Sequence, residues 1–132
     1  MYKTFLRLFR PPANTTSLTE KALSGFVALL GIGLIMFTSQ FFLPDEDIPW
    51  VVASMGASAV LLFAVPLGPL SQPWSFVGGH LLSGLIGVTI AQSIPDVIIA
   101  GPLAVSVAIF VMYVTRCLHP PGGATALSAV VG

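Results

Sequence analysis

The feature that most constrains the fold is a series of four long apolar stretches that contain no Asp, Glu, Lys or Arg. Only 8% of the 132 residues are charged, against about 25% in soluble domains, so lipid is the expected solvent. An apolar run of roughly 17 residues or more can cross a bilayer, and helices satisfy their own backbone there. The sequence predicts an all-α, polytopic transmembrane helix bundle. We expect four full spans, at residues 22–43, 49–65, 74–94 and 97–115, and a partial fifth from about Gly123.

The charged residues predict how these spans are oriented. With four crossings, all five basic residues fall on one side of the membrane, and four of the five acidic residues fall on the other. The positive-inside rule places the basic side in the cytoplasm. We therefore expect a basic cytoplasmic tail at 1–21 and a transmembrane domain at 22–132. The tail either lies near anionic headgroups or has no role. The basic residues are Lys3, Arg7, Arg10, Lys21 and Arg116, and the acids opposite them are Asp45, Glu46, Asp47 and Asp96.

Short local patterns predict how the helices begin and pack. Ser17 and Glu20 have the spacing of a capping box, in which each side chain binds a backbone N–H at the start of a helix. Small residues at helical spacing let helices approach closely, and this interpretation is favoured over a smooth pore wall. These stripes are Ala100, Ala104 and Ala108 in the fourth span, and Ser83 and Gly87 in the third.

Two similar segments suggest an internal repeat. GASA at residues 56–59 corresponds to GATA at residues 123–126, so that Ser58 corresponds to Thr125. The first segment lies in a span that runs toward the basic side, and the second lies in a span that leaves it. Inverted repeats of this kind place substrate sites at their interface in many transporters. Compositional bias in Gly- and Ala-rich sequence is the alternative explanation.

Enzyme chemistry and metal binding are poorly supported. No acidic residue lies within a span to complete a Ser-His-Asp set with His80 or His119. Cys117 and His119 are two candidate metal ligands without the third or fourth that a zinc site needs. There is no G-x-x-x-x-G-K-[ST] nucleotide motif. The zero net charge gives no reason to expect nucleic acid as a partner. We expect no cofactor, no metal and no enzymatic activity.

The segment LHPPGGATAL, at residues 118–127, fits a binding site for a small anion better than it fits an enzyme or metal site. A helix N-terminus offers unpaired N–H groups and the positive end of the helix dipole. Proline is suited to open a helix, and glycines leave backbone N–H groups accessible. An ordinary helix start is the alternative. The candidate residues here are His119, Pro120, Pro121, Gly122 and Gly123.

Polar residues in other spans extend this candidate site. His80 lies about two turns into the third span, beside a Gly-Gly pair as His119 is, and a polar residue inside a span suggests function. The alternative is a histidine bonded to a neighbouring helix. Ser54 and Ser58 share one face of the second span, and Thr125 corresponds to Ser58. These hydroxyls either line a path or bond back to their own helices.

The motifs together resemble a known family. The segment SMGASAVLLFAVPLGPLSQPWSFVGGHLLSGLIGV, at residues 54–88, and HPPGGATAL, at residues 119–127, are similar to the HPP family of small integral membrane proteins. That resemblance covers about 17–132. It implies a bundle of four or five transmembrane helices and a role in nitrite transport. The family normally completes a helix after HPPGGA, whereas this sequence stops about ten residues into it, so a truncated chain and a half-span are both considered.

The functional expectation is therefore membrane transport of a small anion, with nitrite first. The lipid bilayer, the anion and further copies of the same chain are the expected partners, because short helices bury little on their own. The expected location is the bacterial inner membrane. A non-transporting membrane subunit and a channel or carrier for another small solute are the alternatives.

Overall fold

The fold is a bundle of helices. A computed structural model describes residues 15–132, which hold five α-helices, one short 3-10 helix and no strand within that range. The predicted all-α class is confirmed. The helices are α2 (Leu18–Ser39), α3 (Ile48–Ala64), α4 (Pro73–Ser93), α5 (Val97–Val114) and α6 (Pro121–Val131), and the 3-10 helix is η1 (Pro69–Ser71).

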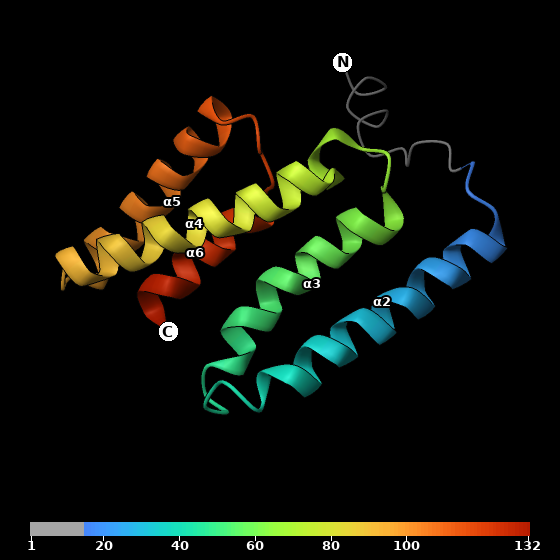
Figure 1. Ribbon diagram of the computed structural model, residues 1–132, viewed down its shortest axis with the longest axis horizontal. Coiled ribbons are helices and arrows are strands. Elements are labelled where there is room, and N and C mark those ends of the chain that lie inside the picture. The colour runs from blue at the N-terminus through green and yellow to red at the C-terminus, as the bar shows by residue number, and fades with distance from the viewer. Residues whose placement is uncertain (1–14) are drawn as a thin grey trace, which may run out of the picture.

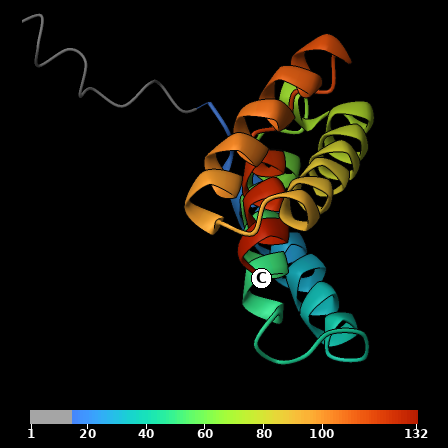
Figure 2. The ribbon, with the colours of Figure 1, turned by 90° about the vertical axis from the view of Figure 1, so that its left-hand side faces the viewer.

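Successive helices run in opposite directions along a common axis, as Figure 1 shows. Helices α4, α5 and α6 pack against one another in all three pairs, α3 packs along α6, and α2 packs along α3. Figure 2 shows α2 on the flank of the bundle. The N-terminal ends of α2, α4 and α6 therefore lie toward one end of the molecule, and those of α3 and α5 toward the other.

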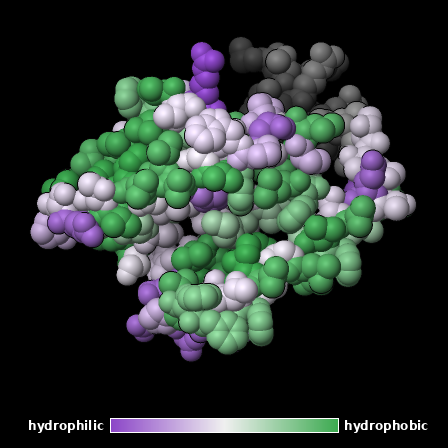
Figure 3. Space-filling view, in the orientation of Figure 1, coloured by the Kyte–Doolittle hydropathy of each residue, from purple (hydrophilic) through white to green (hydrophobic). Residues whose placement is uncertain are grey.

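Three of the described helices are long and apolar enough to cross a membrane, namely α2, α4 and α5. Helix α3 has 17 residues, the length expected for the second span. At about 1.5 Å per residue this helix is somewhat shorter than a hydrocarbon core of about 30 Å. Helix α6, with 11 residues, is the predicted partial span. Large apolar side chains are exposed on every long helix, and the visible face is largely apolar (Figure 3). These features define an integral membrane protein.

The predicted capping box is confirmed at the start of α2. The Ser17 hydroxyl accepts from the Glu20 N–H at 3.2 Å, and the Glu20 carboxylate accepts from the Ser17 N–H at 2.8 Å. The helix therefore begins at Leu18. It ends at Ser39, and the chain turns ahead of Pro44, which disfavours helix in the residue before it. The predictions for Lys3, Arg7 and Arg10 lie outside the described residues.

The small-residue stripes form the contacts of the α4–α5–α6 half. The three alanines of the α5 stripe are completely buried, and two of them form the apolar core with Ala126 of α6. A methyl group on Gly87 would lie 2.5 Å from the Ala126 carbonyl oxygen, so α4 and α6 touch backbone to backbone there. The packing interpretation of both stripes is confirmed. The α5 stripe is Ala100, Ala104 and Ala108, and the α4 stripe is Ser83 and Gly87.

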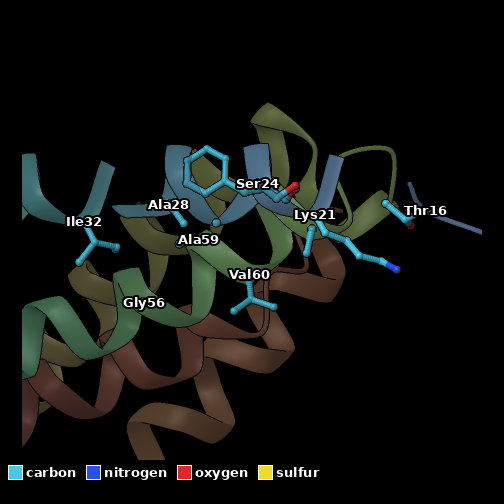
Figure 4. Close-up of a pocket in the computed structure, with 11 residues that line it drawn as sticks. Thr16, Lys21, Ser24, Ala28, Ile32, Gly56, Ala59 and Val60 are labelled. Atoms are coloured by element: carbon cyan, nitrogen blue, oxygen red, sulfur yellow. The ribbon is translucent and has the colours of Figure 1, made fainter. Parts of the chain in front are cut away.

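Helices α2 and α3 meet much more loosely. No residue of α2, all of which the structure describes, is buried. A groove of about 490 Å³ runs between the two helices, with Lys21 and Thr16 at one end and Ala28, Ala59 and Val60 along its length (Figure 4). The Ser24 hydroxyl crosses the contact and donates to the Phe63 carbonyl oxygen at 2.6 Å.

Candidate functional site

A turn after α5 brings His119 into the bundle. Arg116 has φ of 56°, in the left-handed region that glycine usually occupies at a helix end. The Cys117 N–H donates to the Met112 carbonyl at 3.0 Å, and the Arg116 N–H to the Tyr113 carbonyl at 3.2 Å. These two bonds form a Schellman motif. The motif stops α5 and turns the chain toward the bundle interior, where Cys117 and His119 are completely buried.

His119 is anchored to the backbone of η1. Its Nδ1 lies 2.7 Å from the carbonyl oxygen of Leu70. That carbonyl is held in place by Ser71, whose hydroxyl lies 2.7 Å from the Val65 carbonyl and 2.9 Å from the Leu61 carbonyl at the end of α3. Sequence reasoning missed Leu70, because a backbone acceptor has no side-chain signature.

Ser58 joins the two histidines at the centre of the bundle. Its hydroxyl oxygen lies 2.8 Å from Nε2 of His80 and 2.9 Å from Nε2 of His119. The two imidazole rings are 5.0 Å apart, and both contact the Phe76 ring edge to face, at 5.1 and 5.5 Å between centroids. The expectation that the two histidines flank one polar site is met in this geometry.

Thr125 completes the network from α6. Its hydroxyl oxygen lies 2.7 Å from Nδ1 of His80. Thus Ser58 and Thr125, which correspond in the two similar segments, bind the two ring nitrogens of one histidine from helices that run in opposite directions. We call Thr125, His80, Ser58, His119 and the Leu70 carbonyl the polar network.

The bonding partners determine where the protons lie when both imidazoles are neutral. A carbonyl only accepts, so His119 carries its proton on Nδ1 and accepts on Nε2. Ser58 then donates to His119, because donation to the Ser54 carbonyl at 3.1 Å would leave two lone pairs facing each other. Consequently His80 donates from Nε2 to Ser58 and accepts on Nδ1 from Thr125. Each bond of the polar network holds one proton, all pointing toward Leu70.

Glycines allow this network to form. A methyl group on Gly79 would lie 2.6 Å from Cβ of His119, and one on Gly122 would lie 2.9 Å from the Gly79 carbonyl oxygen. The glycines therefore let α4, the His119 turn and α6 approach within backbone contact. Their role as close-packing positions was not predicted.

The start of α6 differs in part from the expectation. The two prolines open the helix, as predicted, with Pro120 as the N-cap and Pro121 as the first helical residue. However, the Gly122 N–H donates to the His119 carbonyl at 2.8 Å, and the Gly123 N–H to the Pro120 carbonyl at 3.0 Å. Both amides therefore donate within the tight first turn, and their contact with a ligand stays a prediction.

Two hollows lie at opposite ends of the polar network. The Asp47 hollow, of about 220 Å³, lies between α3 and α6 and reaches Thr125. Ser54 also lines this hollow. Its hydroxyl donates to the Val51 carbonyl of its own helix at 3.0 Å, which is the second of the two roles considered for these hydroxyls. The Arg116 hollow, of about 280 Å³, lies beside η1 and α5 and includes Leu70. The first is lined among others by Asp47, Trp50 and Ser128, and the second by Pro69, Ser75, Tyr113 and Arg116.

A bundle of apolar helices around a buried polar network defines an integral membrane protein. A family model described as "HPP, transmembrane region" matches residues 13–132. The chain belongs to the HPP family of transmembrane proteins, and the resemblance stated from the motifs is confirmed.

Two curated relatives come from Dictyostelium discoideum and are described as transmembrane proteins. One is 39% identical over 114 residues, which are 83% of this chain and 39% of that protein. The other is 37% identical over 113 residues, which are 83% of this chain and 35% of that protein. The chain thus spans well under half the length of these relatives. No solved structure matches it.

Proposed function

We propose that this protein carries a small anion across the membrane, with nitrite as the first cargo to test, and that it does so without enzymatic chemistry. The observation that supports this most is the polar network itself. It comprises two histidines and two hydroxyls from three helices and the turn before α6, and it lies in the interior of a membrane bundle. Polar side chains are costly inside a membrane and commonly mark a substrate or ion pathway.

The position of the hollows supports a transport path. The Asp47 hollow leads to Thr125 and the Arg116 hollow to Leu70, so the polar network separates two recesses. An anion that passes between them meets hydroxyl and imidazole donors. Helices α3 to α6 contain no Lys or Arg, which suits a small monovalent ion better than a multivalent one.

The membrane arrangement belongs to the same proposal. The N-terminus lies in the cytoplasm, as the positive-inside rule predicts, and the host membrane is a bacterial inner membrane. The working unit is a homo-oligomer, for which the exposed apolar surface of α2 offers a contact face.

Nitrite flux into proteoliposomes tests the proposal. We expect saturable nitrite uptake above that of empty vesicles, and weaker uptake when nitrate or formate competes. A variant with both His80→Ala and His119→Ala should lose the flux. A Thr38→Ala variant is the matched control, since that hydroxyl is exposed and bonds only to Leu34 and Ile35 of its own helix.

The alternatives have distinct outcomes in the same assay. Uptake that the double histidine variant leaves unchanged would refute the proposed site. Uptake of formate or nitrate with no nitrite flux would indicate another small solute. A folded protein that leaves vesicles as tight as empty ones would indicate a non-transporting subunit.

A further inference from the structure

The polar network can hold its hydrogen bonds in two opposite directions on the same atoms. In the neutral arrangement the protons point from Thr125 through His80 and Ser58 to His119. Thr125 has a second acceptor, the carbonyl oxygen of Pro121, at 3.3 Å from its hydroxyl. That second acceptor allows the direction to reverse.

The reversed arrangement holds one additional proton. His119 then carries protons on both ring nitrogens, donating to Ser58 as well as to the carbonyl of η1. Ser58 donates to Nε2 of His80, and Nδ1 of His80 donates to Thr125, which turns its own proton to Pro121. Every polar atom again has a partner of the right kind, at the distances already given, and no heavy atom needs to move.

We propose that the polar network is a proton relay, which takes up one proton from the Asp47 hollow and passes it to His119, and that the transported anion moves together with this proton. The identity of the cargo rests on the proposed function. The relay itself rests on the contacts of Ser58, His80, His119 and Thr125.

The transfer conserves protons at every step. A hydronium ion in the Asp47 hollow gives a proton to the oxygen of Thr125, and Thr125 releases its own proton to Nδ1 of His80. His80 passes its Nε2 proton to Ser58, whose proton moves to Nε2 of His119. Each donor that loses a proton regains one, and the net change is one positive charge on His119. Transfer of that proton from His119 to the accompanying anion, which leaves as the neutral acid, returns His119 to its neutral state.

The surroundings leave this charge without a protein counter-ion. Among residues 15–132, the titratable side chains on the elements around the network are few. Asp47 lines one hollow, Tyr113 and Arg116 line the other, and the Cys117 thiol contacts the Thr115 hydroxyl at 3.0 Å. No carboxylate is paired with either histidine in this range.

This lack of a counter-ion couples the proton to the cargo. A buried charge is costly unless it is paired, so His119 holds the extra proton best when an anion lies close to it. By reciprocity, the proton strengthens the binding of the anion. A monovalent anion and one proton carry no net charge together, so their joint passage does not respond to membrane potential.

The test uses the full chain in proteoliposomes that contain a pH-sensitive dye, with nitrite outside. We expect the lumen to acidify as nitrite enters, with equal numbers of protons and anions, and no response to an imposed potential. Thr125→Val keeps the side-chain shape but removes the hydroxyl, and should lower both fluxes about tenfold, the effect of losing roughly 1.4 kcal/mol of hydrogen bonding. Thr125→Ser restores the hydroxyl and should restore both fluxes.

A second pair of variants covers the case in which Thr125→Val does not fold. Ser58→Ala interrupts the relay between the two histidines. Ser83→Ala is the matched control, because Ser83 is also completely buried and bonds only to the Met112 sulfur, at 3.8 Å. We expect loss of flux in the first variant and retention in the second.

The outcomes separate the relay from the cargo. Nitrite uptake without proton movement overturns the relay and leaves the proposed function intact. Nitrite uptake that Ser58→Ala leaves unchanged has the same meaning. Proton uptake with formate but not nitrite supports the relay and refutes nitrite as cargo. A folded protein that moves neither protons nor anions overturns both proposals.

Nitrogen-15 NMR of labelled histidine tests the neutral arrangement independently of transport. The chain contains two histidines, so one His119→Asn variant assigns the spectrum. We expect the proton on Nδ1 at His119 and on Nε2 at His80. A proton on Nδ1 of neutral His80 would contradict the relay direction.

Discussion

The α4–α5–α6 half of the molecule and the α2–α3 pair are built from equally apolar sequence but pack in different ways. In the first, a methyl group on Gly87 would strike the Ala126 carbonyl at 2.5 Å, whereas in α2 a methyl group on Gly33 would have nothing within 4 Å. Lipid is as apolar as leucine, so helices gain little from hiding leucine and associate through close approach and hydrogen bonds. Close packing therefore follows the small residues and not the hydrophobicity.

The polar network lies in the tightly packed half and at the face of α3 that contacts it. Histidine and threonine come from the tight half, and α3 contributes Ser58 from the face that it turns toward that half. Helix α2 contacts α3 across an open groove and contributes no atom to the network. The tight half thus positions the site, and α2 covers its flank toward lipid.

The largest effect is expected from a side chain at the closest helix contact. Gly87→Leu forces a side chain against the backbone of α6 and should destabilise the protein by more than about 3 kcal/mol. Gly33→Leu places the same residue on the lipid-facing side of α2 and should leave stability nearly unchanged. Unfolding in mixed detergent measures both. Equal losses in the two variants would contradict the proposed difference between the halves.

A smaller effect is expected from Gly79→Ala, which acts at the site itself. The new methyl group would lie 2.6 Å from Cβ of His119, so the His119 turn must shift away from α4. We expect a loss of about 1–3 kcal/mol together with a change in the histidine nitrogen-15 spectrum. Gly33→Ala is the control, with neither change expected. A stable Gly79→Ala protein with an unaltered spectrum would show that the contact is loose.

The smallest effect is expected at the α2–α3 contact. Ser24→Ala removes the hydrogen bond to the Phe63 carbonyl, and bonds of this kind between membrane helices contribute about 0.6 kcal/mol. We expect wider spin-label distances between α2 and α3, with an unchanged distance between α4 and α6. If α4 and α6 also moved apart, α2 would be an integral part of the tight half.

The sequence pointed to the side chains of the polar network but not to the hydrogen bonds that join them. His80, His119, Ser58 and Thr125 were identified because polar residues stand out in apolar spans, and the GASA and GATA segments related the two hydroxyls. The sequence did not reveal that the amides of Gly122 and Gly123 donate to carbonyl groups of the first turn, because helix-start chemistry does not specify these partners.

The spans, their capping and the membrane class were determined by the sequence alone, since hydropathy, charge and capping act over a few residues at a time. The second span, expected at residues 49–65, is helix α3 at Ile48–Ala64. Only the tertiary structure decided which atoms meet. The Leu70 carbonyl sets the tautomer of His119 from 49 residues away, and through Ser58 it sets the direction of the whole network. A backbone carbonyl is the same in every residue, so its partner depends on where the chain has folded.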